Sequence, residues 1–174
     1  MKTAAADMNW DRDVHHRLSP HEWPDGALEW MAPRVILELS SLRKQAGVPM
    51  YPSPVLGAHV RHRTRRAGDG DRHATDNGSR LSDATDFFVR WGDAPAVYRL
   101  AQAIPGIRGI GIYDAMMLRG TPGDFCMFHI DAPDEHAGRA LWVGHGREPV
   151  EYVSQATQPG RYYALLSQML NERK

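Results

Sequence analysis

Two short apolar segments, each carrying a side chain that can be charged, constrain the fold of this chain most. Residues 84–89 hold Asp86 among apolar neighbours, and residues 125–130 hold His129. Burial of an unpaired charge is costly, so each of these groups needs a partner or a metal ion. His73 lies in a loop rich in Gly, Asp and Ser. Two imidazoles and one carboxylate are a ligand set typical of catalytic zinc, so we predict that His73, Asp86 and His129 share one metal ion.

The bulk composition is that of a single globular domain. The chain has 174 residues, of which 42% are hydrophobic and 24% charged, and this is enough for one apolar core. The formal net charge is +0, so the molecule as a whole does not attract polyanions and no nucleic-acid partner is expected. Residues 1–17 are interpreted as a polar lead-in, and residues 18–174 as one domain without repeats or linkers.

The sequence lacks the usual features of membrane-spanning and disulfide-stabilised proteins. Its single cysteine, Cys126, excludes an intramolecular disulfide and is expected to be a buried core residue. No apolar run approaches the ~20 residues that cross a bilayer, and residues 1–13 contain no apolar stretch typical of a signal peptide. We therefore expect no membrane span and synthesis in the cytoplasm, with release by lysis or a dedicated route if the substrate lies outside.

Apolar spacing and helix-stopping residues predict the secondary structure. A helix is predicted to begin near Pro33 and to end before Gly47, and others over 93–104, with Asp93 as N-cap, and 161–172. Strands are predicted over 51–61, 84–89, 107–113 and 125–130, with a short apolar piece at 141–143 and irregular structure over 144–160. Because strands and helices do not alternate regularly, the predicted fold class is α+β, with helices packed on a mostly antiparallel sheet.

The other histidines are weaker candidates for a functional site. The basic run 59–66 contains His59 and His62, but no acidic or cysteine residue nearby completes a ligand set. No aromatic residues are interleaved with its arginines, so a solvated or substrate-facing loop is favoured over a nucleic-acid site. His136 and His145 lie in later loops, where we expect a position on the surface or along a cleft.

The segments around the three predicted ligands resemble those of the M15 metallopeptidases. These are zinc D,D-carboxypeptidases and L,D- or D,D-endopeptidases that cut the peptide part of bacterial peptidoglycan. Members carry Ser-x-His, Ala-x-Asp and Phe-Val-His-Val-Asp, and this chain has Asp-Arg-His at 71–73, Ala-Thr-Asp at 84–86 and Met-Phe-His-Ile-Asp at 127–131. The likeness covers roughly residues 18–143.

This resemblance implies a fold, a cofactor and further site residues. The fold would be Hedgehog/DD-peptidase-like, and the cofactor would be Zn²⁺ on the three predicted ligands. Asp131 would accept a ring N–H from a ligand histidine, which fixes its tautomer. Arg61 would face the substrate and help to hold an oxyanion or a carboxylate. Arg139 and Trp142 stand where members have an arginine and a tryptophan, and they are the expected substrate-binding residues.

The resemblance also implies a function. The expected activity is hydrolysis of peptide bonds in a peptidoglycan stem peptide or cross-bridge, by a phage lysin, a virion-associated enzyme or a delivered toxin. Such an enzyme acts on the cell wall. The sequence leaves open whether the bond is of the D,D or the L,D type, and it does not determine the oligomeric state.

Two departures from the family pattern leave alternatives open. Twelve residues separate His73 from Asp86, where members have about half as many, so Asp83 is a second candidate ligand; the apolar context favours Asp86. Some members place a Glu or Asp three residues before the second histidine, where this chain has Cys126. Others place a histidine five residues before it, where this chain has Asp124, which makes Asp124 the candidate general base.

Two other functions are compatible with the same residues. The domain could be a peptidoglycan-binding or phage assembly module that keeps the fold and has lost catalysis, as the longer ligand spacing and Cys126 suggest. Alternatively, the histidines bind nothing and the domain is purely structural. Metal analysis separates the structural domain from the other two, and murein zymography separates an enzyme from a binding module.

Overall fold

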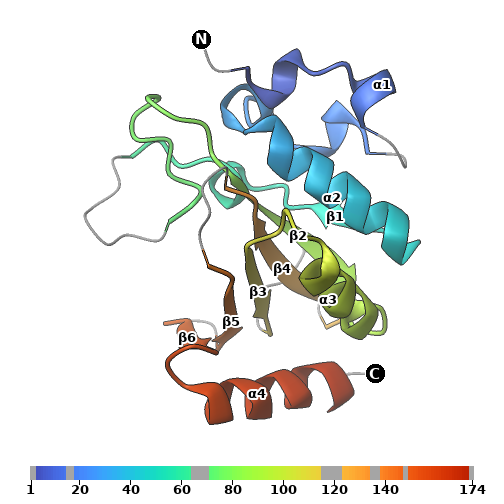
Figure 1. Cartoon of the computed structure of the whole chain (residues 1–174), viewed down its shortest axis with the longest axis vertical. Helices are drawn as coiled ribbons and strands as arrows, with labels where there is room; N and C mark the ends of the chain where they lie inside the picture. The colour runs from blue at the N-terminus through green and yellow to red at the C-terminus, as the bar shows by residue number, and fades with distance from the viewer. Residues whose placement is uncertain are drawn as a thin grey trace.

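The computed structural model describes residues 3–14, 18–63, 71–114, 123–133, 138–146 and 149–172. These residues form a six-stranded mixed sheet with helices packed against it, which confirms the predicted α+β class (Figure 1). The helices are α1 (Trp10–Asp13), α2 (Pro33–Ala46), α3 (Ala94–Ala103) and α4 (Pro159–Glu172). The strands are β1 (Tyr51–Pro52), β2 (Ala84–Arg90), β3 (Gly109–Tyr113), β4 (Phe125–Asp131), β5 (Ala140–His145) and β6 (Glu151–Ser154).

The sheet is mostly antiparallel, as predicted. Its strands lie in the order β1-β2-β4-β3-β5-β6, and only β3 and β5 run parallel to each other. These two strands are parallel because β4, which comes between them in the sequence, runs antiparallel on the far side of β3. β4 therefore has hydrogen-bonded neighbours on both sides and lies in the interior of the sheet.

Side-chain alternation along β4 separates an apolar face of the sheet from a polar one. Cys126, Phe128 and Ile130 belong to the main hydrophobic core, which also contains side chains of α2, α3 and α4. His129 and Asp131 alternate with them, so they lie on the face that the helices leave open. Cys126 is fully buried, which confirms its predicted place in the core.

The observed boundaries agree with some predictions and correct others. α2 begins at Pro33, and Gly47 ends it in the left-handed conformation, with a φ of 65° that a glycine adopts without strain. The strand predicted over 51–61 is wrong beyond β1. Pro52 has no N–H to extend a ladder, so the chain leaves the sheet edge and forms a 3-10 turn at Leu56–Ala58.

Two further segments differ from their predicted conformation or contacts. The stretch 144–160 was expected to be irregular, but it contains β6, which pairs with β5. β6 has only four residues and two of them are exposed, so its hydrophobic pattern is too short to recognise. Asp93 does precede α3, but its side chain makes no capping hydrogen bond.

The described part of the N-terminal lead-in packs onto the domain. Ala5 and Val14 are buried in the main core. The Ala5 N–H donates to the Met31 carbonyl over 2.9 Å, and the rings of Trp10 and Trp23 meet edge to face. These contacts tie residues 3–14 to the segment that leads into α2.

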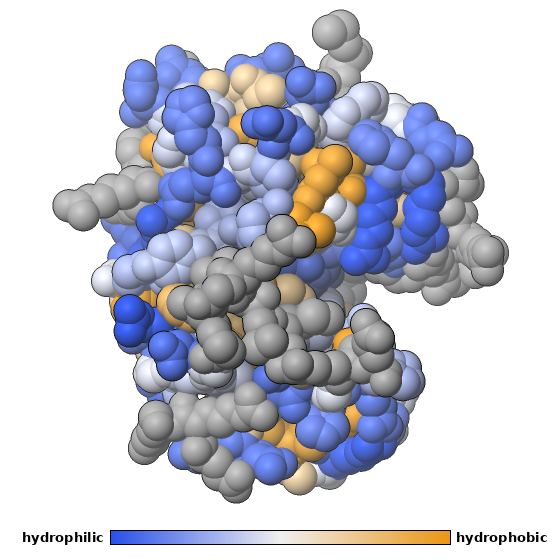
Figure 2. All heavy atoms as spheres, turned by 180° about the vertical axis from the view of Figure 1, so that it is seen from behind, coloured by the Kyte–Doolittle hydropathy of each residue, from blue (hydrophilic) through white to orange (hydrophobic). Residues whose placement is uncertain are grey.

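One face of the molecule shows little continuous apolar area among its described residues (Figure 2). The face seen from behind the view of Figure 1 is mostly hydrophilic, and its apolar residues form small separated patches (Figure 2). Among the described helices, none is both long and apolar enough to cross a membrane.

Candidate metal centre

Strand register brings two of the predicted ligands together. Asp86 on β2 and His129 on β4 are directly opposite each other in an antiparallel pair, where Cβ atoms lie about 4.5–5.5 Å apart. His73 arrives from a loop whose backbone is fixed, since the Arg61 N–H donates to the His73 carbonyl over 2.8 Å. The Asp71 carboxylate accepts the His73 N–H over 3.0 Å. Sheet pairing and this loop therefore place all three side chains on the open face.

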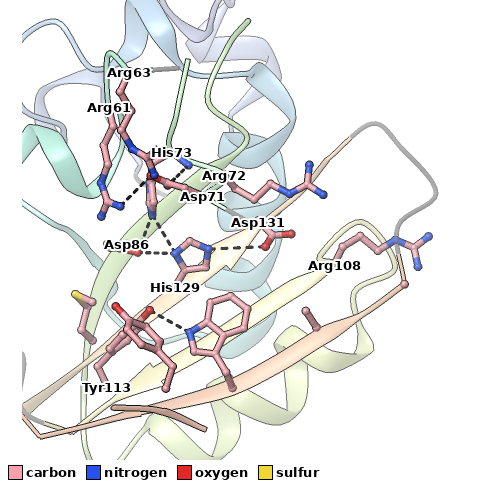
Figure 3. A pocket seen from close by; sticks show the side chains of 15 residues that line it. Arg61, Arg63, Asp71, Arg72, His73, Asp86, Arg108, Tyr113, His129 and Asp131 are labelled. Atoms are coloured by element: carbon pink, nitrogen blue, oxygen red, sulfur yellow. Dashed lines mark hydrogen bonds and ion pairs between the residues drawn. The ribbon is translucent and has the colours of Figure 1, made fainter. Parts of the chain in front are cut away.

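The three side chains converge on one point (Figure 3). His129 Nδ1 lies 2.8 Å from Asp86 Oδ1 and 3.1 Å from His73 Nε2. His73 Nε2 is 3.5 Å from Asp86 Oδ1. All three residues are buried, and their potential ligand atoms all lie within 4.8 Å of one another. The group can hold a metal ion, and Asp86 rather than Asp83 is its carboxylate.

The cluster is strongly polarised. Burial disfavours the charged carboxylate, but hydrogen bonds from His129 and His73 outweigh it and hold the pKa of Asp86 well below its usual range. Burial likewise opposes protonation of His129, yet its bonds to Asp131 and Asp86 raise the His129 pKa to about 9. Without metal, the cluster is thus a buried carboxylate with an imidazolium. A metal ion must displace that proton, so its affinity falls at lower pH.

Asp131 lies on the far side of the His129 ring from Asp86, at ion-pair distance from the second ring nitrogen. Its Oδ2 is 3.8 Å from His129 Nε2, while Nδ1 faces the cluster. Gly109 is directly opposite Asp131 on β3, and a Cβ at Gly109 would come within 1.8 Å of Oδ2. The carboxylate occupies the space that this glycine leaves.

The Trp142 indole packs beside the His129 ring. The Trp142 ring centroid lies 5.0 Å from that of His129. On the neighbouring strand β3, Gly111 is the residue directly opposite Trp142. A Cβ at Gly111 would come within 2.4 Å of Trp142 Nε1. The alternating glycines of β3 thus make room for the groups that surround His129.

This packing predicts the effect of a single methyl group. The Gly111→Ala substitution should lower the free energy of unfolding by about 1–3 kcal/mol, because the added Cβ forces the Trp142 indole out of place. Urea unfolding measures the change. Gly92→Ala is the matched control, since a Cβ there meets nothing within 4 Å. Equal stability of the two variants would contradict the close approach of Gly111 to the indole.

The cluster forms part of the lining of an open pocket of about 740 Å³. The lining includes four arginines: Arg61, Arg63, Arg72 and Arg108. It also includes four aromatic or apolar side chains: Tyr113, Met127, Trp142 and Tyr152. The pocket therefore combines a group of cations, a buried metal-binding group and an aromatic wall.

The structure supports the pocket position of Arg61 and Trp142, both of which line it. The Arg61 guanidinium donates to Asp71 Oδ2 over 3.1 Å and to the Gly57 carbonyl over 2.9 Å. Arg63 binds the same Asp71 oxygen over 2.6 Å. The Asp71 carboxylate thus links two rim arginines to the backbone of His73.

Asp124, the candidate base, does not reach the cluster. It precedes β4, and its carbonyl accepts the Trp91 N–H over 3.1 Å at the opposite end of the strand from Asp131. Four residues of extended chain lie between Asp124 and His129, so their Cα atoms are roughly 16 Å apart. No side chain spans that distance, so the general-base role predicted for Asp124 is wrong.

Arg139 is also displaced from its predicted role. Its Nη1 donates to the Gln102 carbonyl and its Nη2 to the Ile104 carbonyl over 3.4 Å. Arg139 does not line the pocket, whereas Ala140 and Trp142 do. Strand alternation explains the difference, because Arg139 has the parity of the core-facing residues of β5. It satisfies carbonyls at the C-terminal end of α3 instead of binding a substrate.

The remaining candidates have structural partners. Asp83 forms ion pairs with Arg80 over 2.7 Å and with Arg72 over 3.5 Å. Both ring nitrogens of His59 form buried hydrogen bonds, with Thr85 and with the Ser53 carbonyl. His145 Nδ1 lies 2.5 Å from Asp114 Oδ2. His136 lies outside the described residues. Among the described residues, His73, Asp86 and His129 remain as the group that could hold a metal ion.

Sequence reasoning missed several pocket residues, notably Tyr113 and the arginines other than Arg61. Tyr113 shares the parity of Gly109 and Gly111 on β3, so alternation could have placed it on the open face. Arg72 lies in a loop without a strand period, so no sequence signal placed it at the pocket. Arg108 lies in the predicted strand 107–113 but shares the parity of the core residues Ile110 and Ile112, so alternation alone did not place it there.

Comparisons of the chain with models of protein families, with curated proteins and with solved structures find no match.

Proposed function

We propose that the protein is a zinc-dependent peptidase that hydrolyses peptide bonds of bacterial peptidoglycan, on a Hedgehog/DD-peptidase-like fold. The observation that carries the proposal is the buried convergence of His73 Nε2, Asp86 Oδ1 and His129 Nδ1 in the lining of an open pocket. The motif resemblance around these residues supplies the substrate class. Such an enzyme reaches the cell wall after lysis or by dedicated delivery.

The donor set fits zinc. Zinc binds imidazole nitrogen and carboxylate oxygen at ~2.0–2.2 Å in tetrahedral geometry, so ligand atoms are about 3.3 Å apart. The three separations here are 2.8, 3.1 and 3.5 Å. Three protein ligands leave the fourth position for solvent or substrate, as in catalytic sites. A bound zinc ion would lower the pKa of water and polarise a carbonyl group.

The chain's own residues would position the substrate. Peptidoglycan stem peptides carry free carboxylates, and guanidinium groups bind carboxylates through paired hydrogen bonds. Arg61 and Arg63 share Asp71, and Arg72 is paired with Asp83. Among the described residues, no carboxylate pairs with Arg108, so it is the rim cation most available to a substrate carboxylate.

A binding module that has lost catalysis is the second candidate, and one observation favours it. The carboxylates that line the described pocket are Asp71, Asp86 and Asp131. Asp71 is held by arginines, Asp86 belongs to the metal group, and Asp131 faces the His129 ring. Of the described acidic residues, none is an obvious proton acceptor for water.

Two measurements test the proposed function. Purified protein is analysed for bound metal, and its lytic activity is followed by zymography on murein, with and without a chelator. The proposal requires about one zinc per chain and clearing that the chelator abolishes and zinc restores. Bound zinc without clearing would support the binding module. Absence of stoichiometric zinc, after incubation with excess zinc, would exclude both.

The two acidic residues near β4 allow a sharper comparison. Asp131→Asn should lower zinc affinity or murein hydrolysis by about 10–100-fold, because it removes the charge that orients His129. Asp124→Asn, at the other end of the same strand, should leave both unchanged. Zinc affinity is measured by competition with a chromophoric chelator, and hydrolysis by release of muropeptides. A larger loss in the Asp124 variant would refute this account of the site.

A further inference from the structure

Tyr113 is fixed in the pocket beside the metal-binding group. It ends β3 and lines the pocket on the same face as His129, and its side chain is almost fully buried. The Trp142 indole N–H donates to the Tyr113 hydroxyl over 3.0 Å. A Cβ at Gly144 would come within 2.2 Å of the Tyr113 ring, so that glycine makes room for it. Tyr113, Asp86 and His129 line the same pocket, with Tyr113 below the other two in the view of Figure 3.

The Tyr113 hydroxyl keeps its own proton for another partner. An indole N–H is only a donor, so the phenol oxygen accepts in that hydrogen bond and its O–H is not used there. Among the residues that the structure describes, no acceptor takes this proton. Burial and the negative charge of Asp86 raise the pKa of Tyr113, so the phenol stays protonated at neutral pH. The pocket therefore contains a buried, oriented O–H donor.

We propose that Tyr113 is a catalytic residue that donates a hydrogen bond to the carbonyl oxygen of the scissile peptide bond. This inference rests on the proposed peptidase function. Water adds to the carbonyl carbon, the C–N bond breaks, and the proton that water loses ends on the leaving amine. Tyr113 keeps its proton throughout, and its hydrogen bond strengthens as negative charge grows on the oxygen.

Tyr113 suits this role better than Arg61, the residue expected from the sequence. The Arg61 side chain is 46% exposed, and its guanidinium already donates to Asp71 and to the Gly57 carbonyl. An exposed and paired cation is screened by water, whereas a buried donor needs no reorganisation during the reaction. The Trp142 hydrogen bond provides the fixed orientation that such a donor requires.

The test replaces only the hydroxyl group. Tyr113→Phe should lower kcat on cross-linked muropeptides by about 10²–10³-fold, the usual effect of losing one oxyanion donor, with KM changed by no more than about 3-fold. Zinc content and melting temperature should match the wild type. Tyr163→Phe is the matched control, because Tyr163 is exposed on α4. An unchanged kcat in the Tyr113 variant would overturn the proposal.

A binding measurement gives a second readout that does not depend on turnover. Phosphinate isosteres of a D,D and an L,D dipeptide mimic the tetrahedral oxyanion, and calorimetry measures their affinity for the zinc-loaded protein. Tyr113→Phe should weaken binding of the tighter phosphinate by about 100-fold and leave the affinity for the corresponding product peptide unchanged. Equal phosphinate affinity in wild type and variant would overturn the role of Tyr113.

The outcomes separate this inference from the proposed function. A wild-type protein that neither cleaves muropeptides nor binds either phosphinate refutes the peptidase and Tyr113 together. A wild-type protein that does both, with a fully active Tyr113→Phe variant, refutes Tyr113 alone. If the variant fails to fold, fluorotyrosine at position 113 keeps the ring and strengthens the O–H donor. It should then tighten phosphinate binding, and an unchanged affinity would overturn the proposal.

Discussion

Replacing His129 by alanine is expected to abolish both zinc binding and murein hydrolysis. His129 contributes one of three nitrogen and oxygen atoms that converge on the metal position, and its Nδ1 lies within 3.1 Å of the other two. Loss of a group that merely orients a ligand typically lowers affinity or activity ~10–100-fold, so loss of the ligand itself should exceed that range. Zinc titration and zymography measure the two effects.

The same substitution should also remove the stabilisation that zinc confers. A ligand that binds only the folded state raises stability in proportion to the logarithm of its concentration over its Kd. Wild-type protein should therefore melt at a higher temperature in zinc than in chelator, while His129→Ala should melt at the same temperature in both. His21→Ala, which changes an exposed histidine outside the cluster, should behave as wild type.

Loss of His129 also affects the metal-free protein, so a second variant is needed. Removing one partner from a buried charge pair typically costs ~3–5 kcal/mol, because the Asp86 carboxylate is left with one imidazole. Asp86→Asn keeps the shape, removes that charge and should equally abolish zinc binding. Wild-type zinc affinity and lysis in either folded variant would refute the metal centre.

The second large effect concerns pH, and it arises from His59. This imidazole is fully buried, with Nδ1 2.8 Å from Thr85 Oγ1 and Nε2 2.7 Å from the Ser53 carbonyl oxygen. A carbonyl only accepts, so Nε2 carries the proton, and Nδ1 accepts from the threonine hydroxyl. Burial lowers the pKa of His59 to about 4, from 6.5. The native fold therefore holds this histidine in its neutral form.

The folded protein should lose stability through His59 as the pH falls. The pKa of His59 is lower in the folded state than in the unfolded state. The contribution of His59 to the free energy of unfolding is therefore complete above about pH 6.5 and is lost as pH falls towards 4. The shift corresponds to about 3 kcal/mol. His59→Gln keeps a donor for the Ser53 carbonyl but does not titrate, so it should lose this component of the pH dependence.

Urea unfolding in chelator, at about pH 7.5 and about pH 4.5, measures this component. The stability advantage of wild type over His59→Gln should shrink by roughly 2–3 kcal/mol at the lower pH. The metal-binding group titrates in both proteins, so its contribution cancels in the difference. Parallel pH profiles for the two proteins would show that His59 is not held neutral by the fold.

Local sequence patterns were sufficient for the elements that carry the site. Apolar runs around Asp86 and His129 predicted two strands, and the cost of burying an unpaired charge predicted that each of these side chains has a partner. Pro33 and Gly47 determined the ends of α2, since each acts on the backbone of its own residue. Such effects depend on near neighbours in the chain, so they can be predicted without knowledge of the tertiary structure.

Errors arose where a side chain's role depends on its distance from a remote group. Asp124 has a suitable carboxylate, but it lies at the wrong end of β4. Arg139 has a suitable guanidinium, but strand parity turns it to the α3 carbonyls. Tyr113 was overlooked because its hydroxyl becomes significant only through the indole of Trp142, which reaches it from β5.

The sequence by itself determined the α+β class, the ligand types and the strands on which two of them stand, because periodicity and the cost of unpaired charge are local properties. Only the tertiary structure decided that Asp86 and not Asp83 joins the histidines, since that choice depends on the register of β2 against β4. It also decided which cations and which hydroxyl line the pocket. Those positions follow from strand order and alternation across the whole sheet, which no single segment specifies.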